Sequence, residues 1–125
     1  MSNLYKPTES ELEILSILWD KEKASVREVH QIVHKTKNVG YTTTLKLMQI
    51  MFAKGLVSRN DSFKTHIYTA NFNKLAAQEQ YLDKLTKVLF NGSTTALVLK
   101  ALEKQTSNEQ ELAEIKAVIT DLENK

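Results

Sequence analysis

The side chains best suited to binding chemistry lie between Thr42 and Ala53, where hydroxyl, amide and ammonium groups recur at helical spacing. At 100° per residue, these side chains divide between two opposite arcs of one predicted helix. The apolar arc contains Thr44, Leu45, Leu47, Met48, Met51 and Phe52. The outward arc contains Thr42, Thr43, Lys46, Gln49, Ile50 and Ala53.

The outward arc carries groups that match the edges of base pairs in the major groove of DNA. A threonine can donate to a phosphate or contact a thymine methyl group, Gln49 can pair with adenine, and Lys46 can reach guanine or phosphate. The amino end of a helix also attracts phosphate. An amphipathic surface helix without any ligand has the same composition, so residue types alone leave the two interpretations equal.

No constellation for catalysis accompanies this helix. His30 and His34 are four residues apart on one helical face, but a zinc site needs a third ligand. Ordinary surface histidines are the simpler interpretation, and a pair of metal ligands is the alternative. The three glycines build no phosphate loop or dinucleotide motif, and the absence of cysteine excludes disulfides and thiolate chemistry. We expect no enzyme, no cofactor and no bound metal.

Positive charge is concentrated in the first half of the 125-residue chain, although the whole chain has a net charge of only +2. Residues 21–64 contain nine Lys or Arg and three acids, a net charge of +6, whereas residues 73–125 contain seven Lys and eight acids. This division indicates a module that binds a polyanion, joined to a second part. A solvated basic surface is the alternative from charge alone.

Capping patterns and hydrophobic spacing predict three helices in this basic half. Thr8 and Glu11 have the spacing of a capping box, and Ser25 and Glu28 repeat it for a second helix. Gly55 suits the left-handed residue that ends the third helix. The predicted helices extend over about 9–20, from 26 to a fading end between 35 and 40, and from 41 or 42 to 54.

After these helices the sequence takes on the period of strands. Residues 56–59 and 65–69 are rich in strand formers, and the turn-forming residues 60–64 separate them. Because an isolated hairpin is marginal in water, this one must pack on the preceding helices. Three helices with a terminal hairpin are the winged form of the helix-turn-helix. Together with the basic charge, this arrangement favours DNA binding by the third helix.

Helical spacing returns at residue 73 and predicts three further helices. Gly92 ends the first, Ser93 caps a second that runs to Gln105, and Ser107 with Gln110 forms another capping box. No apolar run exceeds four residues, whereas a membrane span needs about 20. The amino terminus has no apolar secretory stretch. We therefore expect a cytoplasmic protein without membrane insertion.

The fold class predicted is mainly α, with a winged-helix DNA-binding domain over 1–72 and a three-helix dimerisation domain over 73–125. The second domain has more apolar side chains than three short helices can bury alone, which predicts a homodimer. The side chains expected at the dimer contact are Leu82, Leu85, Leu89, Leu97, Leu102, Ile115 and Ile119.

Four stretches carry the motifs of one known family: Thr8–Trp19, Ser25–His30, Tyr41–Leu56 and Leu89–Val98. In order and spacing they resemble the BlaI/MecI/CopY family of penicillinase-type repressors, over essentially the whole chain. The resemblance implies a homodimer that binds a palindromic operator in double-stranded DNA and represses adjacent genes. Carried over by position, base contacts would come from Thr42, Thr43 and Lys46, and phosphate contacts from Arg59 and Lys64.

The sequence departs from this family at three places. Ile50 stands where the family often has a basic residue. Members that respond to β-lactams work beside a membrane sensor-protease and are cleaved, commonly at an Asn-Phe bond, but Lys100 and Ala101 occupy that position here. The copper-responsive branch uses a cysteine motif that this chain lacks. The alternative function is a winged-helix module that docks proteins instead of DNA, which a weak dependence on salt would reveal.

Overall fold

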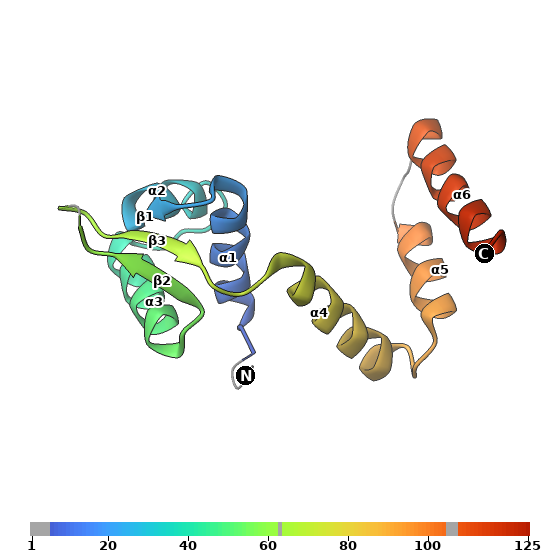
Figure 1. Cartoon of the computed structure of the whole chain (residues 1–125), viewed down its shortest axis with the longest axis horizontal. Helices are drawn as coiled ribbons and strands as arrows, with labels where there is room; N and C mark the ends of the chain where they lie inside the picture. Colours follow the sequence, from blue (N-terminus) through green and yellow to red (C-terminus); the bar gives the residue numbers. More distant parts are fainter. Residues whose placement is uncertain (1–5, 63, 105–107) are drawn as a thin grey trace. The chain divides into compact units, whose positions relative to one another are not determined.

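A computed structural model of the chain describes residues 6–62, 64–104 and 108–125. The chain divides into two compact units, Met1–Glu79 and Gln80–Lys125. The described residues form six helices and three short strands, and all three strands belong to the first unit (Figure 1). The predicted fold class, a mainly helical winged helix followed by further helices, is confirmed.

Reciprocal capping boxes begin the first two helices, as predicted. For α1 (Glu9–Lys21), the Glu11 N–H donates to the Thr8 hydroxyl at 3.2 Å, and the Thr8 N–H donates to the Glu11 carboxylate at 2.8 Å. For α2 (Val26–Val33), Ser25 and Glu28 make the same two bonds at 3.2 and 2.8 Å. Each box satisfies amide groups that the first turn of a helix leaves without partners.

The third helix, α3 (Tyr41–Lys54), ends at Gly55, which has a φ of 84°. This left-handed conformation suits glycine, because other residues pay a steric cost there. The Gly55 N–H donates to the Phe52 carbonyl at 3.0 Å, and the Leu56 N–H donates to the Met51 carbonyl at 2.9 Å. The turn directs the chain from the end of α3 straight into the sheet.

The sheet has three antiparallel strands where the sequence predicted a two-stranded hairpin. The order is β1 (Ala24–Ser25), β3 (Ile67–Ala70) and β2 (Val57–Asn60). The central strand pairs on one side with β2 and on the other with β1, where Ala24 lies opposite Tyr68. Two residues between two helices are too short to show any alternation, so β1 was missed. Figure 1 shows α1, α2 and α3 gathered around this sheet.

One hydrophobic core joins the sheet to the three helices. It is formed by Ile14, Leu15, Leu18, Ala24, Val26, Val29, Met48, Met51, Leu56, Val57 and Tyr68. Burying each large side chain among them contributes about 1.5–3 kcal/mol. Phe52 was predicted to belong to the buried arc of α3, but its side chain is 40% exposed. That prediction is wrong: the Phe52 ring lies at the surface, where the Arg59 guanidinium covers it at 4.3 Å from the ring centroid.

An ion pair with one buried partner, Glu11, joins α1 to α3. The Glu11 side chain at the start of α1 accepts from the Lys54 ammonium at the end of α3, with a distance of 2.8 Å. Burial alone would raise the pKa of Glu11, but hydrogen bonds from Lys54 and Thr8, together with the Lys54 charge, outweigh burial and lower it. Glu11 therefore remains ionised inside the fold and fixes α3 against α1.

The remaining helices are α4 (Lys74–Leu89), α5 (Thr94–Lys104) and α6 (Glu109–Glu123). The Ser93 hydroxyl accepts from the Ala96 N–H at 3.0 Å, as its predicted capping role requires. Asn108 caps α6 with Glu111, one residue later than predicted from Gln110. Ser107 and Gln105 lie outside the described residues. None of the helices in the described ranges is long and apolar enough to span a membrane.

Candidate nucleic-acid interface

The face of α3 that the sequence predicted to point outward is exposed in the structure. Thr44, Met48 and Met51 are buried against the rest of the first unit. The six side chains of the predicted outward arc are all exposed: Thr42, Thr43, Lys46, Gln49, Ile50 and Ala53. This face therefore offers hydroxyl, amide and ammonium groups to a ligand, together with the aliphatic side chain of Ile50.

Contacts between α2 and α3 fix the rotation of this face. His30 Nδ1 lies 3.0 Å from the Thr44 hydroxyl, and the His30 ring meets the Tyr41 ring edge-on with centroids 5.7 Å apart. The His34 ring lies 5.4 Å from the His30 ring. His30 thus belongs to the packing between the two helices, whereas His34 is exposed beside it. In the described ranges no three residues of the types that bind metals come together.

The wing, formed by β2, β3 and the residues between them, places a second cationic group beside α3. The Arg59 guanidinium lies over the Phe52 ring, 4.3 Å from its centroid. Its Nε donates to the Asp61 carboxylate at 2.9 Å. Hydrogen bonds to Tyr68 and Asp61 raise the pKa of Arg59, so its positive charge is permanent. Lys64, the other predicted wing contact, is exposed.

Two residues of this arrangement were not predicted from the sequence. Phe52 links the end of α3 to the wing through Arg59, and Asp61 binds Arg59 and also lies 2.8 Å from His66 Nδ1. The sequence did contain a signal for this ion pair, since Asp61 follows Arg59 by two residues. The structure shows that Arg59 is an ion-paired cation and not an isolated one.

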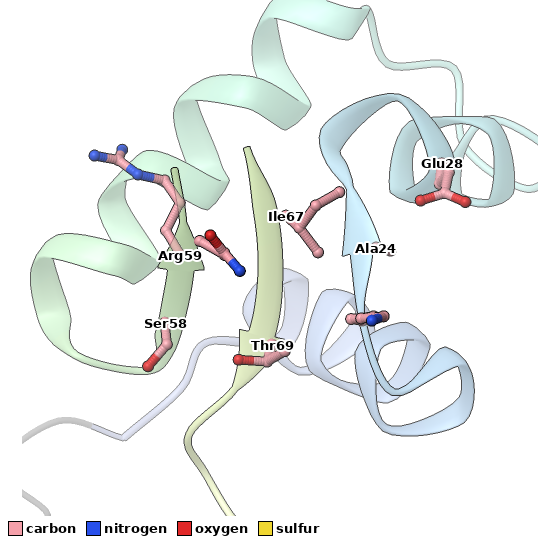
Figure 2. Close-up of a pocket in the computed structure, with 8 residues that line it drawn as sticks. Ala24, Glu28, Ser58, Arg59, Ile67 and Thr69 are labelled. Carbon is pink, nitrogen blue, oxygen red and sulfur yellow. The ribbon is translucent and has the colours of Figure 1, made fainter. Parts of the chain in front are cut away.

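A pocket of about 490 Å³ lies beside the sheet, and Arg59 is among the residues that line it (Figure 2). Strand pairing of Ser58 with Thr69 and of Asn60 with Ile67 brings these four side chains to its floor. Two of its polar side chains already have partners: the Ser58 hydroxyl donates to the Asn71 side chain, and the Asn60 side-chain oxygen Oδ1 accepts from the Ser62 N–H. The charged side chains of Lys23, Glu28 and Arg59 also line the pocket, so it shares Arg59 with the wing.

Many large apolar side chains are exposed on the second unit. Among the residues predicted for the dimer contact, Leu97 and Ile115 are half-buried. The others are exposed: Leu82, Leu85, Leu89, Leu102 and Ile119. Neither α5 nor α6 has a buried residue. Lys100 and Ala101, at the position matched to the cleavage site, are exposed on α5.

Sequence comparisons identify proteins similar to this chain. The profile of the family described as Penicillinase repressor matches residues 7–121. The penicillinase repressor of Staphylococcus aureus is 24% identical over 120 residues, which cover 93% of this chain and 92% of the relative. The penicillinase repressor of Bacillus licheniformis is 20% identical over 125 residues, 100% of this chain and 98% of the relative. The methicillin resistance regulatory protein MecI of S. aureus is 21% identical over 115 residues, 92% and 94% of the two chains.

Proposed function

Because the chain belongs to the penicillinase repressor family, we propose that it represses transcription by binding a palindromic DNA operator as a homodimer. The family is one of repressors and not of enzymes. The observation that carries the proposal is the exposed polar face of α3, held in place by a buried core and flanked by the wing. Residues 21–64, which include this face, have a net charge of +6.

Each part of the surface has its own task in this proposal. Thr42, Thr43, Lys46 and Gln49 on α3 contact base edges in the major groove, and Arg59 and Lys64 on the wing contact phosphates. Base contacts specify the sequence, whereas phosphate contacts position the protein on the duplex. Repression then follows because an occupied operator that overlaps a promoter excludes the polymerase.

The second half of the chain supplies the dimer in this proposal. The exposed apolar side chains of α4, α5 and α6 would leave a costly patch in contact with water. A second copy of the chain can cover this patch, with residues 1–72 serving as the DNA-binding domain and 73–125 as the dimerisation domain. Relief of repression by cleavage at Lys100–Ala101, with a membrane sensor-protease as partner, stays a prediction from the family resemblance.

Selection from a pool of randomised duplexes tests this function with the full chain. We expect one duplex to be enriched, and its affinity to fall steeply with salt, because each neutralised phosphate releases counterions. A shuffled duplex of the same composition is the control and should bind more weakly. A chain that docks proteins instead would enrich no sequence, and its binding to a protein partner through an apolar contact would depend little on salt.

A further inference from the structure

The wing carries one carboxylate that serves two partners at once. Asp61 Oδ1 lies 2.9 Å from Arg59 Nε and 2.8 Å from His66 Nδ1. The other carboxylate oxygen lies 3.5 Å from Arg59 Nη2, so the acid faces the fork of the guanidinium. One face of the same guanidinium lies over the Phe52 ring. Arg59 therefore contacts an aromatic ring on α3 with its face and an acid on the wing with its edge.

This position gives Asp61 two effects on an approaching phosphate. The carboxylate occupies the Nε and Nη2 edge of the guanidinium, one of the two edges that Arg59 could offer for a bidentate phosphate contact. Its own negative charge also repels the phosphate. Both partners are partly exposed, with side-chain exposures of 25% for Arg59 and 55% for Asp61. An ion pair of this kind is weak in water, so a phosphate that is held firmly in place can displace it.

We propose that Asp61 sets the DNA specificity of the wing by weakening the attraction of Arg59 for the phosphates of unmatched DNA. The inference rests on the proposed DNA-binding function. In a loose complex a phosphate meets Arg59 through charge alone, and Asp61 opposes that attraction in full. In a fitted complex, the phosphate is held in place by the other contacts and displaces Asp61 from the guanidinium, while Phe52 still orients the guanidinium. Asp61 then opposes only part of the attraction. Asp61 thus reduces binding to unmatched DNA more than binding to the operator.

The test uses the full chain, the duplex enriched by selection and a shuffled duplex of the same composition. Asp61→Asn removes the charge with little change in shape. We expect its affinity for the shuffled duplex to rise by about threefold or more, with a salt slope steeper by about one. Affinity for the selected duplex should rise less, so the ratio of the two affinities falls.

Two further variants assign the effect to the wing. Asp20→Asn makes the same change in net charge at an exposed position on α1, and it should leave the affinity ratio unchanged. In a chain that already carries Arg59→Ala, the substitution Asp61→Asn should lose most of its effect on the shuffled duplex, because its partner is gone.

The results separate this inference from the function on which it rests. If the parent prefers the selected duplex but Asp61→Asn leaves both affinities and the salt slope unchanged, the role of Asp61 is wrong and the function stands. An equal effect of Asp20→Asn, or a full effect in the Arg59→Ala chain, overturns the role as well. If the parent binds no duplex with a dependence on salt, the function fails and the inference fails with it.

Discussion

Thr43 and Lys46 are three residues apart on α3, and both side chains are exposed. Thr43→Ala removes one hydroxyl from the face proposed to enter the groove. We expect a loss of about 1–3 kcal/mol on the selected duplex and little change on a shuffled one, because base contacts discriminate between sequences. Binding curves on both duplexes at two salt concentrations measure the difference.

Lys64→Ala on the wing is the matched control for this substitution. Because Lys64 is proposed to contact phosphate, its removal should weaken binding to both duplexes alike and reduce the salt slope by about one. A Thr43→Ala chain that binds the selected duplex as tightly as the parent would show that the proposed base contacts are assigned to the wrong side chain.

Side-chain exposure on α3 followed from periodicity, but the contacts made by those side chains did not. The 100° spacing placed Thr44 and Met48 inside and Lys46 outside, because a single core lies on one side of the helix. Phe52 is exposed because the nearby Arg59 gives its ring a partner at the surface. This contact joins residues of two different elements, α3 and β2, so neither the periodicity of one helix nor the composition of the chain could predict it.

At the scale of elements, local patterns predicted the helix starts and the long-range pairing was missed. The Thr8 and Ser25 capping boxes act within four residues, so they can be read directly from the sequence. The strand β1 exists only because its two residues pair with β3, more than forty positions away. Asn108 forms the capping box of α6 with Glu111. Ser107 and Gln110 have the same spacing one residue earlier, so the sequence alone could not decide between the two pairs.

The ion pair between Glu11 and Lys54 gives the packing of α1 on α3 a dependence on pH. The pKa of Glu11 is lower in the folded chain than in the unfolded chain. Glu11 therefore stabilises the fold at pH values above its unfolded pKa, and this stabilisation is lost as the pH falls through its folded pKa. Glu11→Gln should reduce the free energy of unfolding by about 1–2 kcal/mol at neutral pH. Because the parent itself loses this stabilisation in acid, the difference should shrink there, as urea unfolding at both pH values can measure.

Glu13→Gln on the same helix provides the control. Glu13 pairs with Lys37 at 2.7 Å, but both side chains are about 40% exposed, and a pair of this kind contributes about 0–1 kcal/mol. We expect a smaller loss at neutral pH for this variant than for Glu11→Gln. A Glu11→Gln deficit that stays the same size in neutral and acidic urea would contradict the stabilising role of the ionised Glu11.

At the scale of the whole molecule, the two units differ in how they bury apolar surface. The first unit encloses its core among three helices and a sheet. The second leaves Leu89 70% exposed and Leu82 55% exposed, and α5 and α6 contain no buried side chain. The sequence predicted this excess of apolar residues. It could not predict which of them contact a second chain, because those contacts depend on how two chains pack and not on a pattern within one chain.

The symmetry of the bound DNA tests the central claim most directly, since a dimeric repressor must read two half-sites. Footprinting of the full chain on the selected duplex should show two protected half-sites related by a two-fold axis. Their centres should lie about one helical turn apart, or a multiple of it. Protection of a single asymmetric half-site at saturating protein would contradict the account of a homodimer that presents two copies of α3 to a palindromic operator.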